Sequence, residues 1–143
     1  MSELTIEQIG SRSSKWGEGP IFWQDHLYYV DIEGHTLIRL DTQSGVEKIW
    51  DMDERIGTVV PCQSGDLLCA GDSGIYRFNP LDGSKISLAD PEAEKRPDNR
   101  FNDGKCDPGG RFWAGTISTV KKTGDASLYQ LDEFGSLKRM ISG

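Results

Sequence analysis

The sequence lacks the features that mark several large classes of protein. No run of about 18 apolar residues occurs among its 143 residues, which argues against a membrane-spanning helix. Positive charge is scarce, because 16 lysines and arginines face 23 aspartates and glutamates, for a net charge of -7. Nucleic acids and anionic membranes attract positively charged surfaces, so neither is an expected partner.

Cysteine is also scarce, and its placement indicates no cross-link. Cys62, Cys69 and Cys106 are odd in number and show no paired CxxC spacing, which argues against a disulfide framework and a zinc site. The first seven residues lack the basic start and apolar stretch of a signal peptide. The expected location is therefore the reducing cytoplasm. Cys69 and Cys106 lie in strand patterns and are expected to be buried thiols.

Motifs for nucleophilic catalysis and for helices are missing as well. The sequence contains no Gly-x-Ser-x-Gly motif and no recognisable Ser-His-Asp or Cys-His arrangement. His26 and His35 lie in separate turns and do not have the spacing of a metal-binding pair. No window of a dozen residues keeps the apolar spacing of an amphipathic helix, so a helix-rich fold is not expected.

What the sequence does contain is a unit of four short apolar runs that repeats three times. The runs are bounded by glycine, proline, asparagine and aspartate, which is typical of strands joined by tight turns. Arg39, Arg77 and Gln130 occupy equivalent positions in the three units, at steps of 38 and 53 residues. The pattern predicts an all-β fold of about twelve strands, arranged as three four-stranded antiparallel blades of a β-propeller, with no helix longer than two turns. We expect five aromatic residues to fill the core between blades: Trp16, Phe22, Trp23, Phe112 and Trp113.

Three blades are too few to close a propeller ring, which needs about four to eight. Residues 1–143 are therefore expected to form a partial propeller that is incomplete as a functional unit. The two end blades would each expose an apolar face. The chain is either a piece of a longer protein or associates with another copy, as a homodimer that closes the ring.

Two clusters of polar residues stand where innermost strands of the first and third units begin. Glu18 lies in Gly17-Glu18-Gly19-Pro20, and Arg100, Asn102 and Asp103 lie in the stretch that runs to Lys105. Residues at such positions converge on one mouth of a propeller channel. A carboxylate and an amide there are suitable ligands for a hard metal ion, and an arginine and an asparagine are suitable donors to a small polar substrate.

Simpler interpretations of the same residues remain open. Asn102-Asp103-Gly104 is also compatible with an ordinary hairpin turn. Glu18 between two glycines is compatible with an exposed loop acid, and Arg100 with the solvated end of the charged stretch from residue 92 to residue 100.

The chain resembles the senescence marker protein, gluconolactonase and luciferin-regenerating family. The resemblance extends from about residue 16 to the end of the chain, and covers about the first half of a family member. It is carried by Gly17-Glu18-Gly19-Pro20, Val30-Asp31-Ile32, Arg100-Phe101-Asn102-Asp103-Gly104-Lys105, Asp107-Pro108-Gly109-Gly110-Arg111 and Ala114-Gly115-Thr116.

The resemblance implies a six-bladed propeller that hydrolyses sugar lactones with one divalent metal ion in its channel, calcium or zinc. Glu18 matches the metal-binding glutamate of the family. Arg100 and Asn102 match residues that contact the substrate, and Asp103 is given a supporting role beside them. The metal would polarise the lactone carbonyl and acidify a bound water.

The sequence also departs from the family pattern. The remaining metal ligands, an asparagine and an aspartate that also serves as base, belong downstream of the point that matches Gly143. The acid that often follows the Gly-Thr of the third unit falls near Val120, which has no polar side chain. Three functions therefore stay open: a lactonase that is complete only in a longer chain or an assembly, a non-catalytic half-propeller that binds a ligand or partner, and a gene fragment.

Overall fold

The computed structural model describes residues 3–143, and these form twelve β-strands and one short 3-10 turn, η1 (Ala93–Lys95). The strands are β1 (Gly17–Trp23), β2 (His26–Asp31), β3 (Thr36–Asp41), β4 (Glu47–Asp51), β5 (Ile56–Pro61), β6 (Leu67–Gly71), β7 (Gly74–Phe78), β8 (Lys85–Ala89), β9 (Asn99–Cys106), β10 (Phe112–Ser118), β11 (Ser127–Leu131) and β12 (Leu137–Ser142). No helix between residues 3 and 143 is long and apolar enough to cross a bilayer.

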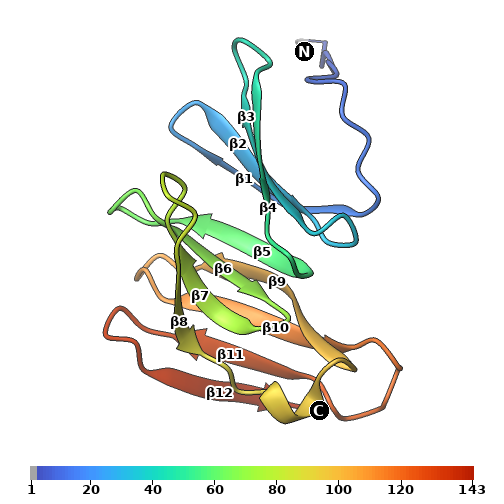
Figure 1. The fold of residues 1–143 in the computed structure, drawn as a ribbon, viewed down its shortest axis with the longest axis vertical. Helices are drawn as coiled ribbons and strands as arrows, with labels where there is room; N and C mark the ends of the chain where they lie inside the picture. Colours follow the sequence, from blue (N-terminus) through green and yellow to red (C-terminus); the bar gives the residue numbers. More distant parts are fainter. Residues whose placement is uncertain (1–2) are drawn as a thin grey trace.

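The strands form three antiparallel four-stranded sheets, each made of consecutive strands. The sheets follow one another down the molecule, with β1–β4 at the top and β9–β12 at the bottom (Figure 1). The predicted all-β fold of three four-stranded units is thereby confirmed. Antiparallel neighbours form because each apolar run is short and ends in a tight turn that reverses the chain.

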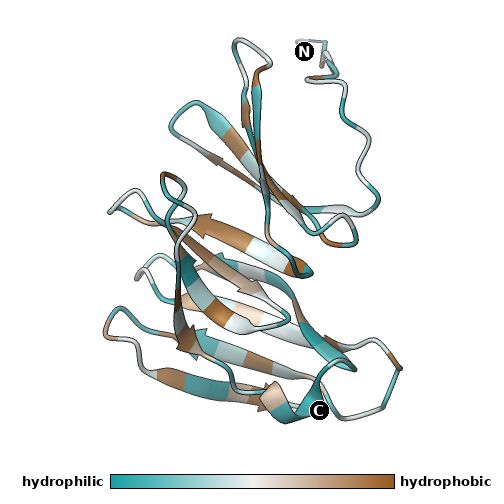
Figure 2. Cartoon of the chain, viewed as in Figure 1, coloured by the Kyte–Doolittle hydropathy of each residue, from teal (hydrophilic) through white to brown (hydrophobic). Residues whose placement is uncertain are grey.

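Two apolar cores hold the three sheets together, and the most apolar segments lie on strands (Figure 2). The first core joins the first two sheets through Val30, Leu37 and Met52 on one side and Ile56, Val59 and Phe78 on the other. The second joins the second and third sheets through residues that include Val60, Ala70, Ile75, Phe101, Phe112 and Tyr129. Each core is a sheet-on-sheet interface of side chains that alternate along their strands.

Two expectations about burial are wrong in part. Phe112 is buried as expected, but Trp16, Phe22 and Trp23 keep 54%, 60% and 42% of their surface exposed. Trp16 precedes β1, Phe22 lies on the outward face of the first sheet, and Trp23 is the last residue of β1, beside the turn to β2. Cys69 is buried, but Cys106 is exposed, because it is the last residue of β9.

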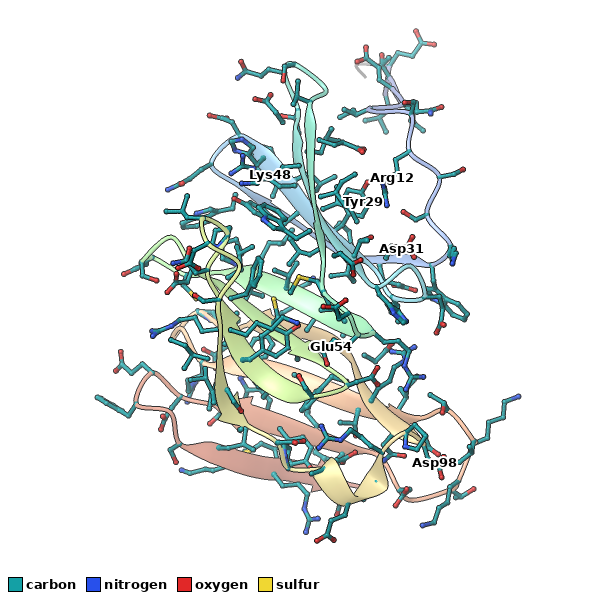
Figure 3. The ribbon with its side chains drawn as sticks, viewed as in Figure 1. Arg12, Tyr29, Asp31, Lys48, Glu54 and Asp98 are labelled. Atoms are coloured by element: carbon teal, nitrogen blue, oxygen red, sulfur yellow. The ribbon has the colours of Figure 1, made fainter. Side chains whose placement is uncertain are left out.

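Asp31, at the end of β2, is a buried carboxylate that ties the chain before β1 to the first sheet. It accepts hydrogen bonds from the backbone N–H groups of Lys15, Trp16 and Gly34, at 2.9, 2.8 and 3.1 Å. It lies beside the segment that carries Arg12 (Figure 3). Burial alone raises the pKa of a carboxyl, but these three donors outweigh burial and hold the pKa of Asp31 below its usual value.

The Asp31→Asn variant should lower the free energy of unfolding by about 1–3 kcal/mol at pH 7, because a charged acceptor is lost. Since the folded pKa is depressed, the carboxylate's contribution is complete above the unfolded pKa, about 3.9, and is lost as pH falls through the lower folded pKa. Urea unfolding of both proteins at pH 7 and pH 3 measures this. The difference between them should shrink on acidification, and a difference that stays constant would contradict the account.

Candidate functional site at the mouth of the inner strands

The inner strands β1, β5 and β9 contact one another and begin at the same end of the molecule. Near that end, each inner strand has one residue more than the strand to which it is hydrogen-bonded, which makes a β-bulge. The bulge lies between Glu18 and Ile21 in β1, between Ile56 and Thr58 in β5, and in β9 opposite residues 114–116. Asn102 and Asp103 are the residues in the bulge of β9. A β-bulge redirects side chains at the rim of a sheet, which suits a binding mouth.

Glu18 stands on the exposed part of the first bulge. Its carboxylate accepts a hydrogen bond from the indole N–H of Trp16 at 3.1 Å. The next residue, Gly19, has a φ of +61°, and a Cβ there would lie 3.5 Å from the carbonyl oxygen of Gly57. Glycine therefore lets β1 turn sharply beside β5, directly after Glu18.

Arg100 and Asn102 are joined directly. Arg100 is only 6% exposed, and its Nη1 donates to the carbonyl oxygen of Phe101 at 3.0 Å and to Oδ1 of Asn102 at 3.1 Å. Burial lowers the pKa of Arg100, and the nearby Arg55 lowers it further, while Glu33, Asp72 and Glu18 act in the opposite direction. The acidic side chains of the first two sheets are thus close enough to act on this arginine.

Asp103 is exposed on the same bulge. Its Oδ1 accepts a hydrogen bond from the backbone N–H of Gly104 at 2.8 Å, which fixes the carboxylate against its own strand. The second oxygen has no partner among the described residues. The interpretation of this stretch as a simple hairpin turn is wrong, because residues 99–106 are continuous strand.

The second sheet also contributes to the mouth, through two residues that the sequence reading missed. Arg55 donates from Nε and Nη2 to both carboxylate oxygens of Asp72, with a shortest distance of 2.8 Å. Its Nη2 also donates to the carbonyl oxygen of Pro97 at 3.1 Å. The pair therefore ties the second sheet to the segment that leads into Arg100. The sequence did contain one signal for Arg55, which is its position. Arg55 directly precedes the inner strand β5, much as Glu18 and Arg100 lie at the starts of the inner strands β1 and β9.

Removing the Arg55 side chain should therefore destabilise the mouth. The Arg55→Met variant is expected to lose about 1–3 kcal/mol of unfolding free energy, because Asp72 loses its charge-assisted hydrogen bonds in a half-buried site. Arg77→Met is the matched control, because Arg77 pairs with Asp66 at 3.3 Å on the exposed surface. Such a pair contributes about 0–1 kcal/mol. Chemical denaturation should separate the two variants, and equal losses would refute the difference.

A buried carboxylate, that of Glu92, is hydrogen-bonded to the first residue of β9 and to strands β10 and β11. Glu92 accepts hydrogen bonds from Nδ2 of Asn99 at 2.9 Å, from the hydroxyl of Thr116 at 3.1 Å and from the hydroxyl of Tyr129 at 3.0 Å. The Lys95 ammonium lies 3.7 Å from it and 3.2 Å from the carboxylate of Asp125. Asn99, the residue directly before Arg100, is thus hydrogen-bonded to Glu92 in the segment that leads into β9.

Comparison with known proteins decides the family. Residues 16–143 match the SMP-30/Gluconolactonase/LRE-like region. The chain belongs to this family. It is 36% identical to a regucalcin of Danio rerio over 97% of this chain and 48% of the relative. It is 38% identical to a regucalcin of Xenopus laevis over 82% of this chain and 40% of the relative.

Solved structures agree with the family assignment. A calcium-binding protein, regucalcin, from Agrobacterium tumefaciens superposes with a TM-score of 0.83 at 25% identity, over 90% of this chain and 44% of its own. A luciferin-regenerating enzyme superposes with a TM-score of 0.79, also at 25% identity, over 90% of this chain and 46% of its own. The three sheets are therefore blades of a partial propeller, and the chain spans about half the length of the relatives it matches.

No group of three or more histidine, cysteine, aspartate and glutamate side chains within residues 3–143 is placed to hold a metal ion. Glu18 can supply one carboxylate, whereas Oδ1 of Asn102 already accepts from a guanidinium. Val120, near which the sequence pattern expects an acid, is an exposed residue between β10 and β11.

Proposed function

We propose that this chain supplies the substrate-binding half of a divalent-metal-dependent site that hydrolyses sugar lactones. The observation that carries the proposal is the hydrogen-bonded pair of Arg100 and Asn102 on a bulge of β9, at the same mouth as Glu18. Membership of the gluconolactonase family supports it, as does a Bacillus subtilis relative, 32% identical, that is named as a candidate sugar lactone lactonase.

Arg100 and Asn102 would bind and orient the lactone. Because Oδ1 of Asn102 accepts from Arg100, its Nδ2 group is left to donate to a hydroxyl or carbonyl oxygen of the sugar. The guanidinium favours oxygen atoms that gain negative charge as the ring opens. The free oxygen of Asp103 would accept from a sugar hydroxyl, which gives this residue its supporting role.

Glu18 would be one metal ligand among several, with the others supplied from outside residues 3–143. Calcium or zinc are the ions proposed, and a solved relative described as a calcium-binding protein supports calcium. A bound divalent ion polarises a lactone carbonyl and lowers the pKa of water. One carboxylate does not make a tight calcium site, so we propose that the 143-residue chain alone binds calcium only at about millimolar concentration or more weakly.

A second candidate function is a non-catalytic half-propeller that binds a sugar or a partner. The incomplete set of acidic ligands in residues 3–143 favours it. The cytoplasmic location stays a prediction, supported by the three free cysteines.

Trp16 provides a direct test, because its indole donates to Glu18 and its fluorescence reports on that carboxylate. Titration of the chain with calcium, and separately with zinc, should change tryptophan emission at about millimolar metal. The change should disappear in Glu18→Gln, which keeps the shape of the side chain but loses its charge.

The Glu133→Gln variant is the control, because Glu133 is an exposed acid in the distant turn between β11 and β12. It should respond to metal as the unmodified chain does. A metal response that survives in Glu18→Gln would remove Glu18 from the proposed site, and a response lost in both variants would point to general charge screening.

A further inference from the structure

The two end sheets each present one face that no other sheet covers. In the first sheet, Val30 and Leu37 face the second sheet, so alternate residues face outward. In the third sheet, Phe112 and Tyr129 face the second sheet, and their neighbours along each strand face outward. We refer to these outward faces as the first end face and the third end face.

The first end face is apolar with an acid at its outer strand. Cross-strand pairing places Phe22, Leu27, Leu40 and Glu47 in one row across β1 to β4. The extended segment before β1 runs beside the first sheet (Figure 1), and its Gly10 lies next to Leu40 and Glu47. Ile38 and Leu40 on this face are therefore only 0% and 3% exposed, and a groove of about 290 Å³ remains. The groove is lined by Ile9, Gly17, Glu18, Pro20, Leu27, Tyr29 and Leu40. The same segment leaves Leu4 and Ile6 93% and 96% exposed.

The third end face is apolar with basic residues at its edges. Pairing across β9 to β12 places Lys105, Trp113, Gln130 and Lys138 in one row. The parallel row includes Gly115, Leu128 and Ile141, the last of which is 62% exposed. The face therefore combines a tryptophan and branched side chains with two lysines, where the first end face carries a glutamate.

The rows on the two end faces correspond in position along their strands, and they carry opposite charges at the outer strand. Phe22 and Lys105 both lie near the last residue of an inner strand, and Glu47 and Lys138 both lie at the beginning of an outer strand. The interfaces already present inside the chain follow the same scheme, since each sheet packs its outgoing face on the incoming face of the next. The third end face therefore has the position of an outgoing face, and the first end face has the position of an incoming face.

We propose that the third end face of one chain packs on the first end face of a second copy, and the reverse, so that two chains close one ring. A two-fold rotation about the channel produces both contacts at once. Each contact buries the apolar surface that the segment before β1 leaves uncovered and places Lys138 opposite Glu47. The ring also brings a second Glu18 and a second pair of Arg100 and Asn102 into the channel, which one copy lacks. This proposal stands independently of the lactonase function.

Sedimentation equilibrium of the 143-residue chain tests the proposal. At micromolar concentration the mass should be twice the monomer mass of 15.9 kDa. Glu47→Lys and Lys138→Glu should each raise the dissociation constant about threefold to tenfold, because each places like charges opposite one another. The double variant restores the opposite charges in both contacts and should return to within about threefold of the unmodified chain.

A second pair of variants tests the apolar part of the faces. Leu128→Glu, at the centre of the third end face, should raise the dissociation constant at least about tenfold. Leu81→Glu is the control, because Leu81 is 90% exposed on the turn between β7 and β8, away from both end faces. Far-ultraviolet circular dichroism checks that each variant remains folded.

Three results would overturn the proposal. The first is a monomer at 100 µM or about that concentration, which would mean that only further blades of a longer chain cover these faces. The second is a mass above that of a dimer, which indicates open-ended association. The third is a dimer that neither the charge exchange nor Leu128→Glu affects. Lactone binding is not part of this readout, so failure here leaves the proposed function untouched.

Discussion

Replacing Glu92 with alanine is expected to cost about 3–5 kcal/mol of unfolding free energy, the largest loss anticipated for a single side chain. The carboxylate is the shared acceptor for Asn99, Thr116 and Tyr129. Its removal leaves the buried Tyr129 hydroxyl without its acceptor and takes a charged acceptor from Asn99 and Thr116, which keep only the carbonyl oxygens of Asp125 and Ser127. Chemical denaturation with two spectroscopic probes measures the loss.

The Glu94→Ala variant serves as the control for Glu92→Ala. Glu94 lies two residues away on the same 3-10 turn, but it is exposed. Its replacement should change stability by no more than about 0.5 kcal/mol. If the two variants were equally stable, Glu92 would not be the acceptor that holds the start of β9.

The second large effect is expected at Gly57, where β5 passes directly against β9. A Cβ added at this position would contact the carbonyl oxygens of Phe101 and Asn102 and the carbonyl carbon of Phe101. Because these are backbone atoms, the strand itself must move. Gly57→Ala should therefore cost about 1–3 kcal/mol or more and displace Asn102 from its bond with Arg100.

The Gly115→Ala variant separates this steric effect from a general effect of glycine in a strand. Gly115 lies in β10, and a Cβ there meets only a side-chain atom of Leu128, at an ordinary 3.9 Å. This variant should be neutral or slightly stabilising. Thermal unfolding of both proteins is sufficient, and an equally stable Gly57→Ala would show that β5 and β9 have room to separate.

The fold could be predicted because local and global signals agree. In the second unit, the runs at residues 56–62, 66–70, 75–78 and 85–88 became β5 to β8 with small changes at their ends. The turns between them are short and rich in glycine, aspartate and asparagine. A repeated four-strand unit leaves few alternatives to a propeller blade.

The candidate site could be predicted only where a residue type was unusual for its position. Glu18, Arg100 and Asn102 stand out because charged and amide groups seldom begin an apolar strand. The bulges that orient these side chains depend on which residues pair across neighbouring strands, and this register cannot be read from a single sequence. Gly19-Pro20 within a strand was the local signal of the first bulge. Arg55 was overlooked because its partners, Asp72 and Pro97, are distant in sequence.

Burial was predicted less well, for a reason that is also physical. Trp16, Phe22 and Trp23 are apolar and were expected in the core, but Trp16 precedes β1 and Trp23 is its last residue, and no other sheet covers the outward face on which Phe22 lies. Hydrophobicity indicates that a surface tends to be covered, and it does not indicate which molecule covers it. Cys106 is exposed because it lies where β9 leaves the sheet.

The most direct test of the central claim is an NMR titration of the ¹⁵N-labelled chain with D-glucono-1,5-lactone. Backbone amide resonances of Glu18, Asn102 and Gly104 are expected to shift, together with the side-chain amide of Asn102. The resonances of Gly45, Gly65 and Gly135, in the turns at the opposite end of the strands, should stay in place. Shifts confined to those turns, or no shift at any of the mouth residues at saturating lactone, would contradict the claim that these residues form a lactone-binding mouth.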